Sequence, residues 1–419
     1  MQAIIAIPET LEALNQEKIT QLIRQPVCGV PLLVRAIVTA ARTGAGEVLL
    51  VCSENLPEEF VQQITQEPLL KRGVRIQVIR INGFDPRSAS HWATLEPRLE
   101  DRFLWLPWNW VTNKNSLAHL PLVEARSVDA TKPAYTTTCE LEGGQDSSEF
   151  SQGTPEGVAV TSPQSVREAE RFLIARSGKV LDGIHTSFNR RLCRPFVRLL
   201  SHTSLTPNAV TFGGVIVAVL SAIAFAHGSY WYSVLGALLF YVAGLFDEMD
   251  GMLARIKFAE SPRGTWLEGF ADGLSYLLLF AGITIGLDRR YGKIAVLMGI
   301  ALLVGAILAL IATSLQRRRA TTPDRPNEYL GRFYDLLEKD SGNHISRIVR
   351  QVQAFQKRGV MIFYIFLFTV VGALPLLFCL ATLGAHLTWI LTLYFNHRFF
   401  AQSLATSTKG MASTSKEAV

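Results

Sequence analysis

The sequence predicts a soluble α/β Rossmann-like domain followed by an α-helical polytopic membrane domain with six transmembrane helices. Residues 1–160 carry 19 acidic and 14 basic residues, whereas the rest of the chain carries 16 acidic and 27 basic residues. The basic part is also the apolar part, with several uncharged stretches long enough to cross a bilayer. This combination favours contact with anionic membrane lipids over nucleic acid, for which no basic patch with interleaved aromatic residues is present.

Changes in composition divide the chain into five segments. The sequence predicts an α/β domain over 1–140, a polar linker over 141–164, amphipathic interfacial helices over 165–206, the membrane domain over 207–400 and a polar tail over 401–419. Five scattered cysteines show no metal-ligand or disulfide spacing. The N-terminus lacks the basic region of a signal peptide, so we expect the first domain to stay in the cytoplasm.

Short β-branched runs alternate with helical patterns in the first domain. Strands are expected at Ala3–Ile7, Glu47–Cys52, Val74–Ile81 and Phe103–Pro107, and helices at Pro31–Thr43 and Pro57–Thr65. This alternation predicts a mainly parallel sheet. Ser162-Pro163 then predicts a helix start, and Gly178–Leu205 predicts an amphipathic helix in the membrane interface.

Apolar stretches beyond Pro207 predict the membrane spans. They are Val210–Ala226, Tyr230–Phe246, Gly269–Leu287, Ile294–Leu315 and the uncharged Gly359–Phe395, which is long enough for two spans. Ten Lys and Arg residues lie in the polar stretch 317–358. The positive-inside rule then places this stretch, both termini and the N-terminal domain in the cytoplasm, with the plasma (inner) membrane as the expected location.

Four acidic residues lie at the ends of predicted spans. Asp247 and Asp250 are three residues apart, and Glu268 and Asp272 are four apart, so each pair shares a helix face. If the two helices pack against each other, four carboxylates converge and need a counter-charge. Mg²⁺, or Mn²⁺ as the alternative, would supply it and could hold a pyrophosphate, while one carboxylate acts as a base. Ordinary ion pairs at helix ends are the competing explanation.

The spacing of these residues resembles a family signature. Asp247-x2-Asp250-Gly251-x2-Ala254-Arg255-x8-Gly264-x3-Glu268-x3-Asp272 is similar to the motif of the CDP-alcohol phosphotransferases. The family has Asp where this chain has Glu268, and the other positions match. Upstream, Leu205-Thr206-Pro207-Asn208 resembles an element at the same place in the family, and Gly178–Arg190 resembles its preceding amphipathic segment.

The resemblance implies roles for individual residues. The metal ligands would be Asp247, Asp250, Glu268 and Asp272, and Asp272 would also be the catalytic base. The residues lining the CDP pocket would be Asn208, Gly251, Ala254, Arg255 and Gly264. The reaction implied transfers a phosphoalcohol group from a CDP-alcohol to a hydroxyl acceptor and releases CMP. The longer side chain of Glu268 would alter metal geometry or acceptor fit.

The first domain has a second resemblance. Arg24–Arg35, followed by Gly44–Val51, resembles the early part of a nucleotidyltransferase domain. In that family a glycine-rich loop holds the nucleotide phosphates, but residues 8–24 contain no glycine. An aspartate expected after a central strand is absent, since Trp108 and Asn109 follow Pro107. We therefore predict a non-catalytic domain.

Two other functions remain open from the sequence. A bifunctional enzyme would combine a cytidylyltransferase with a CDP-inositol-type phosphotransferase, whereas a cation-coupled transporter would use the intramembrane acids for transport. The transporter is disfavoured because the acids lie at span ends and no internal repeat is visible. Neither the alcohol nor the acceptor can be read from the sequence, and the family resemblance favours a homodimer.

Overall fold

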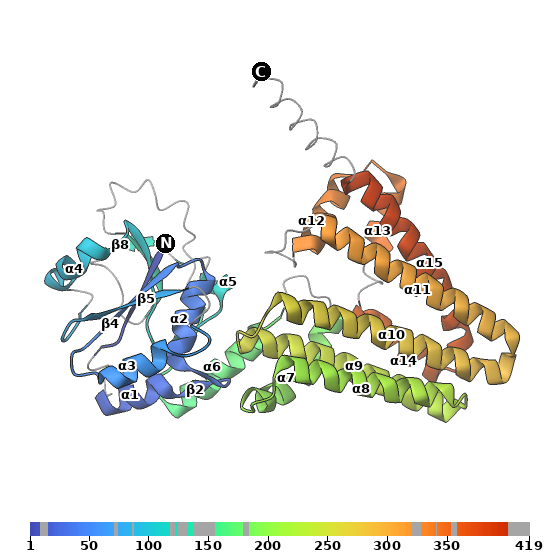
Figure 1. Ribbon diagram of the computed structural model, residues 1–419, viewed down its shortest axis with the longest axis horizontal. Helices are drawn as coiled ribbons and strands as arrows, with labels where there is room; N and C mark the ends of the chain where they lie inside the picture. Colours follow the sequence, from blue (N-terminus) through green and yellow to red (C-terminus); the bar gives the residue numbers. More distant parts are fainter. Residues whose placement is uncertain are drawn as a thin grey trace, which may run out of the picture. The chain divides into compact units, whose positions relative to one another are not determined.

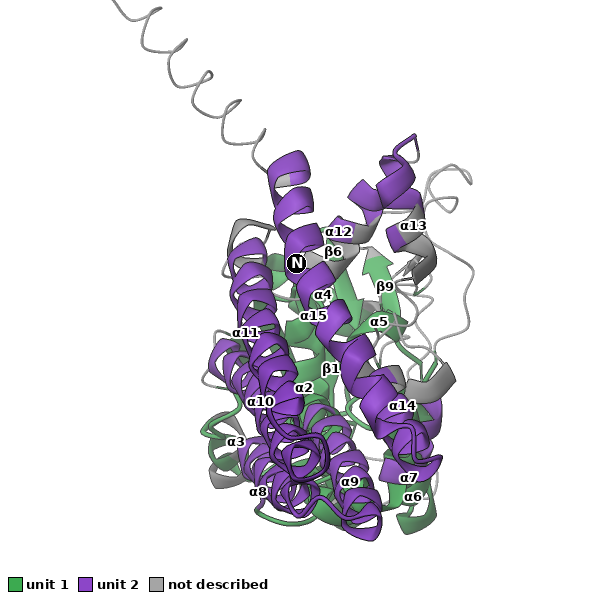
Figure 2. Ribbon diagram, turned by 90° about the vertical axis from the view of Figure 1, so that its right-hand side faces the viewer, with its two compact units in different colours: residues 1–178, 194–204, 252–259 green, residues 179–193, 205–251, 260–419 purple. Residues whose placement is uncertain are grey.

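The structure is a computed structural model and describes most of the chain. The described residues are 1–8, 16–70, 74–85, 88–117, 120, 122–124, 132–137, 156–178, 184–320, 328–340, 342–352 and 358–400. These residues form two compact units (Figure 2). Unit 1 comprises residues 1–178, 194–204 and 252–259, and unit 2 comprises 179–193, 205–251 and 260–419. Most of the predicted linker and the predicted tail lie outside the described residues.

A six-stranded sheet forms the centre of unit 1. Its order is β5 (Arg75–Arg80), β4 (Glu47–Cys52), β1 (Gln2–Ala6), β6 (Arg102–Trp105), β9 (Ala134–Thr137) and β8 (Leu122–Glu124). Only the β6–β9 pair is antiparallel. The mainly parallel sheet expected from the sequence is confirmed, and β1 is buried along its whole length, as a central parallel strand should be.

Short helices and two small antiparallel strand pairs complete unit 1. The helices are α1 (Gln16–Arg24), α2 (Leu32–Arg42), α3 (Glu58–Thr65), α4 (Ala89–Leu95), η1 (Glu96–Arg98), α5 (Lys114–Leu117) and α6 (Pro163–Arg176). β2 (Pro26–Val27) pairs with β3 (Val30–Pro31), and β10 (Val158–Ala159) pairs with β7 (Trp110–Val111). The β10–β7 pairing returns the chain to the α/β part before α6 begins.

The predicted helix start at Ser162 is confirmed. The Ser162 hydroxyl accepts from the Ser165 backbone N–H, the Ser165 hydroxyl accepts from the Ser162 N–H, and Pro163 occupies the first turn. This reciprocal arrangement is a capping box. Helix α6 therefore begins where the sequence predicts, and it carries the buried Glu170 into unit 1.

Long apolar helices make up unit 2 (Figure 1). They are α8 (Pro207–Ala226), α9 (Tyr230–Ile256), α10 (Pro262–Tyr291), α11 (Lys293–Ala320), α14 (Arg358–Val370) and α15 (Leu374–Phe395), preceded by α7 (Ile184–Ser201). The last turn of α9 and the second half of α7 belong to unit 1. Helices α10 and α8, α10 and α11, and α11 and α15 pack against each other.

Five of these helices are long and apolar enough to cross a membrane. They are α8, α9, α10, α11 and α15. The sixth predicted span corresponds to α14, in which the apolar part, Met361–Val370, has ten residues. At 1.5 Å per residue, ten residues extend ~15 Å, about half of a bilayer's hydrocarbon thickness. A turn separates α14 from α15, with Gly372 at φ 78°.

Small residues allow the helices of unit 2 to approach closely. A side chain at Gly282 or Gly286 would overlap with α8 backbone at Ala222 or Phe225. A side chain at Gly214 would lie 3.0 Å from Phe246 of α9. Such small-residue contacts are typical of helix packing in lipid, where apolar burial drives association less than in water.

The polar stretch 317–358 contains two helices that the sequence analysis did not predict. They are α12 (Glu328–Lys339) and α13 (His344–Val352). Asp340, between them, accepts from Arg398 Nε at 2.9 Å and Nη2 at 2.8 Å, and from Ser346 Oγ at 2.6 Å. The hydrogen bonds from Arg398 and Ser346 lower the pKa of the Asp340 carboxyl to about 2. These bonds fix the polar stretch to η3 (Asn396–Phe400), the short helix after α15.

Candidate functional site

The first turns of α8 and α10 bring two predicted CDP-pocket residues together. Thr206 caps α8 through its hydroxyl, which accepts from Ala209 N–H at 3.3 Å. Ser261 caps α10 in the same way, accepting from Gly264 N–H at 3.0 Å. A Cβ on Gly264 would lie 3.8 Å from Asn208 Oδ1 and 3.1 Å from Ser261 Oγ. Asn208 therefore faces the N-terminal end of α10, where the positive end of the helix dipole favours anions such as phosphate.

Asp250 joins α9 to the same end of α8. Its carboxylate is 4% exposed, and the Thr211 hydroxyl donates to Oδ2 in a short hydrogen bond. The same hydroxyl lies 3.2 Å from the Pro207 carbonyl. A hydroxyl has one proton, and a carboxylate is the stronger acceptor, so the bond to Asp250 is favoured. Thr211, near the N-terminal end of α8, thus orients one predicted metal ligand.

The other three predicted ligands are partly buried on α9 and α10. Asp247 lies one turn before Asp250, while Glu268 and Asp272 lie one turn apart on α10. Among the described residues, the structure brings no three His, Cys, Asp or Glu side chains together as a metal site requires. The donors are all carboxylates, which suits a hard divalent cation. The oxygen donors of the four residues therefore suit such a cation. Their convergence on one metal ion remains a prediction.

Two neighbouring polar pairs were missed in the sequence reading. Arg190 Nε of α7 donates to Glu248 Oε2 at 3.2 Å, and both side chains are mostly buried. Tyr241 donates through its hydroxyl to Asn189 Oδ1 at 2.6 Å. Glu248 lies between the two motif acids of α9 in sequence. Its pairing with Arg190 turns its own face of α9 towards α7. The sequence places Asn189 and Arg190 on a predicted helix, but it does not reveal their partners, which lie 52 and 58 residues away.

Two further predicted CDP-pocket residues lie where α9 ends. Ala254 and Arg255 are in the last turn of α9, which belongs to unit 1. Arg255 Nε donates to the carbonyl of Ser177, the residue that ends α6. Gly251 precedes them on α9 within unit 2. One donor of the predicted phosphate-binding arginine is therefore used to tie α9 to α6.

The carboxyl edge of the α/β sheet is occupied by its own side chains. Asn82 accepts from Ser53 Oγ at 3.1 Å and from Glu54 N–H at 2.9 Å beyond β4. Beyond β6, Trp108 is fully buried and Asn109 donates to the Val160 carbonyl at 3.3 Å. Ligands bind at this edge in open α/β sheets. Here Asn82 also donates to Glu54 Oε2 at 3.2 Å, so the described polar residues beyond β4 bond to one another.

Comparison with known protein families decides the class of the membrane part. The model for CDP-alcohol phosphatidyltransferases matches residues 204–394, which include the α8 start and the whole motif from Asp247 to Asp272. Residues 204–394 form a CDP-alcohol phosphatidyltransferase domain. This transferase domain makes up just under half of the chain, and the resemblance read from the motif is confirmed. Members of the family generally depend on a divalent metal.

Curated relatives support the same assignment for this domain. A protein named bifunctional IPC transferase and DIPP synthase from Rubrobacter xylanophilus is 30% identical over 173 residues, 41% of this chain and 38% of its own length. One of the same name from Aquifex aeolicus is 23% identical over 238 residues, 56% of this chain and 49% of its own length. The phosphatidylinositol phosphate synthase of Mycolicibacterium smegmatis is 31% identical over 113 residues, 26% and 50% of the two lengths. The chain spans at most half the length of these relatives.

Proposed function

We propose that this protein is a membrane transferase that moves a phosphoalcohol group from a CDP-alcohol to a hydroxyl acceptor and releases CMP. The observation that carries the proposal is the motif on α9 and α10, with Glu268 as its one departure, within a matching transferase domain. The relatives named for phosphatidylinositol phosphate synthesis and IPC transfer support a role in phospholipid or phosphoalcohol biosynthesis. The transporter alternative has no support from the comparisons.

The proposed site divides the work among residues of three helices. Asn208, Gly251, Ala254, Arg255 and Gly264 would bind CDP, with the glycines leaving room for the ligand near the helix backbone. Asp272 would take the proton from the acceptor hydroxyl, whose oxygen then attacks the β-phosphorus as the bond to CMP breaks. Thr211, which donates to Asp250, would keep that carboxylate oriented.

A divalent metal, Mg²⁺ in the first instance and Mn²⁺ as the alternative, would be held by Asp247, Asp250, Glu268 and Asp272. When bound, it supplies charge neutralisation for the pyrophosphate. The proposal is supported by the oxygen-only donor set and by the burial of Asp250, because a buried carboxylate needs a nearby counter-charge. Glu268 carries the same charge as the aspartate usual at its position.

The N-terminal α/β domain is proposed to be a non-catalytic relative of nucleotidyltransferases. Its support is the missing glycine-rich segment and the sheet edge filled by Trp108, Asn109 and Asn82. The second candidate is a bifunctional enzyme in which this domain acts as a cytidylyltransferase for a CDP-inositol-type transfer. The names of two relatives favour that candidate, since both proteins are called bifunctional.

The membrane arrangement is proposed to have six spans, with the N-terminal domain and active site on the cytoplasmic side of the plasma (inner) membrane. The ten basic residues of 317–358 support this orientation. Partners would be the CDP-alcohol, the acceptor and membrane lipids, and a homodimer is proposed from the family resemblance.

The test is CMP release by the full chain in detergent. A panel of CDP-alcohols is offered with Mg²⁺ and a set of hydroxyl acceptors, with Asp250→Asn as the matched inactive control. We expect acceptor-dependent CMP release with at least one donor, lost in the variant and on chelation. Absence of CMP release from every pair, by a folded protein in lipid, would contradict the proposal.

A further inference from the structure

The end of α9 has an unusual cap. Ala259 N–H donates to the Ala254 carbonyl at 2.8 Å, and Phe258 N–H donates to the Arg255 carbonyl at 3.4 Å. This pair of bonds defines a Schellman cap, in which one residue must adopt the left-handed backbone conformation. That residue is Phe258, with φ 56°. Glycine normally occupies the position, so a bulky residue there requires compensating contacts.

Two arginines of α2 supply those contacts. The Phe258 ring is 9% exposed, and the guanidinium carbons of Arg35 and Arg42 lie 5.0 Å and 4.8 Å from its centroid. Such cation–π contacts strengthen when the ring is withdrawn from water. All three residues belong to unit 1. The cap of α9 is therefore held by a helix that lies more than 200 residues earlier in the sequence.

Arg35 also bonds directly to the end of α9. Its side chain is 2% exposed, and Nη2 donates to the Ile256 carbonyl at 3.0 Å and to the Val27 carbonyl at 2.7 Å. Ile256 is the last helical residue, and its carbonyl has no partner within the helix. Burial lowers the pKa of Arg35 to about 10, so the side chain stays charged at neutral pH. Glu170, in the same unit, acts against the effect of burial and favours the charged form of Arg35.

The next residue extends the attachment to α7. Lys257 Nζ donates to the carbonyls of Thr203 at 2.7 Å and Leu200 at 3.3 Å, both at the end of α7. The β2–β3 turn packs closely against the end of α7. A Cβ on Gly29 would overlap with the Ser201 carbonyl. Gly29 has φ 77°, so this turn needs glycine for its backbone as well as for space.

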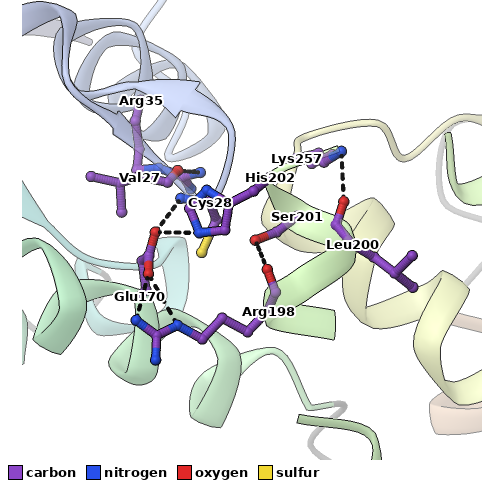
Figure 3. A network of polar contacts seen from close by, with 9 residues as sticks. All are labelled: Val27, Cys28, Arg35, Glu170, Arg198, Leu200, Ser201, His202 and Lys257. Carbon is purple, nitrogen blue, oxygen red and sulfur yellow. Dashed lines mark hydrogen bonds and ion pairs between the residues drawn. The ribbon is translucent and has the colours of Figure 1, made fainter. Parts of the chain in front are cut away.

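Glu170 connects the turn to α6 and α7 (Figure 3). Its carboxylate is 3% exposed and accepts from Cys28 N–H at 3.3 Å. It also pairs with Arg198 at 3.3 Å and His202 at 3.0 Å. Figure 3 shows these donors converging on Glu170 from the turn and from α7. The hairpin, α6, the end of α7 and the end of α9 are thus held by one set of polar contacts within unit 1.

We propose that Arg35 is a positioning residue of the transferase, through which the N-terminal α/β domain holds the last turn of α9. The residues held are Ala254 and Arg255, whose carbonyls form the cap and whose place in the CDP pocket belongs to the proposed function, on which this inference rests. The α/β domain then serves the transfer reaction without binding a nucleotide itself. Since the proposed base Asp272 is on α10 and not in the last turn of α9, the expected defect is in CDP-alcohol binding.

Three variants of the full chain test the proposal by steady-state CMP release. Arg35→Met keeps the length but removes the donors and the charge, and it should raise KM for the CDP-alcohol on the order of ten- to hundredfold, with kcat changed less. Arg35→Lys can still reach both carbonyls and should recover most of the loss. Arg24→Met, at an exposed arginine of the same domain, should behave as wild type. An unchanged KM in Arg35→Met, or an equal defect in the lysine variant, would overturn the proposal.

Hydrogen exchange separates this inference from the proposed function. The amides of Phe258 and Ala259 should exchange faster in Arg35→Met than in wild type, while those of α8 should not change. Hydrogen exchange can be measured even if no CDP-alcohol supports CMP release. That result would contradict the proposed function but not the positioning role of Arg35. If Arg35→Met fails to fold, Phe258→Leu removes the ring and should raise exchange and KM in the same direction. Wild-type exchange at both amides in the folded variant would exclude the positioning role.

Discussion

The clearest residue-level observation is that motif acids differ in their surroundings. Asp250 is buried and accepts a hydrogen bond from the Thr211 hydroxyl, whereas Asp247 and Asp272 are only partly buried. The acids could be found from the sequence because their spacing matches helix geometry. Thr211 could not be assigned a role there, since its partner is 39 residues away and depends on how α8 and α9 pack. The cap residues Thr206 and Ser261 are readable locally, because capping depends on the next three residues.

Thr211→Val should weaken the transferase by removing the hydroxyl that orients Asp250 while keeping the shape of the side chain. Outer hydrogen bonds to metal ligands are typically worth about 10–100-fold in metal affinity or activity. We expect the Mg²⁺ concentration for half-maximal CMP release to rise by that order. Thr211→Ser keeps the hydroxyl and serves as the control. A valine variant with the wild-type Mg²⁺ dependence would show that the bond is not needed.

Asp340 should give the polar stretch between α11 and α14 a pH-dependent stability. Its pKa is lowered from 3.8 to about 2 by hydrogen bonds from Arg398 and Ser346. A depressed pKa stabilises the folded state above about pH 4, and the contribution is lost as the pH falls towards 2. The thermal midpoint of Asp340→Asn should therefore lie below that of wild type at pH 6, and the gap should narrow below pH 4. A gap that stays constant from pH 6 to pH 2.5 would refute this role.

At the scale of elements, the periodicity and end residues of a segment predicted the bounds of several helices and strands. Contacts between distant residues could not be predicted in this way. The predicted strand Glu47–Cys52 has the observed bounds, and the predicted helix Pro31–Thr43 differs from α2 by one residue at each end. Helices α12 and α13 were missed because a high density of charges hid their apolar faces. The buried role of Arg35 could not be foreseen, since its partner Ile256 is 221 residues away.

Helix α7 presents an apolar stripe that suits a membrane surface. Phe188, Leu192, Phe196 and Leu199 are exposed at helical spacing, while Arg194 lies between them in sequence. A spin label at position 196 should report a depth near the headgroup boundary in anionic vesicles. A label at position 194 should remain accessible to aqueous reagents. Equal aqueous accessibility of the two positions would contradict the interfacial placement of α7.

For the whole molecule, the composition of the sequence separated the α/β part from the membrane part. It could not show which segments near the boundary belong to which compact unit. The structure groups residues 194–204 and 252–259 with the α/β part, although both segments adjoin membrane helices in sequence. Such grouping depends on tertiary contacts such as those of Lys257 and Glu170, which leave no periodic pattern. The motif, in contrast, could be recognised from the sequence because all of its residues lie on two consecutive helices, α9 and α10.

The N-terminal domain should lack nucleotidyltransferase activity in the full-length protein. Its described sheet edge is occupied by Asn82, Trp108 and Asn109, and residues 8–24 have no glycine for phosphate binding. Incubation with CTP, Mg²⁺ and a panel of sugar and polyol phosphates should release no pyrophosphate above background. Metal-dependent turnover at this step would establish the bifunctional enzyme in place of the account given for this domain.

The central claim is that α9 and α10 carry a CDP-alcohol transfer site with Asp272 as the base. A positioned carboxylate raises the rate of such proton transfers by ~10²–10⁴-fold. The most direct measurement compares CMP release and CDP-alcohol binding for wild type and Asp272→Asn on the same detergent preparation. The account predicts that wild type releases CMP in an acceptor-dependent reaction, and that the isosteric variant loses at least ~10²-fold of the rate while still binding the donor. Transfer near the wild-type rate by Asp272→Asn would contradict it.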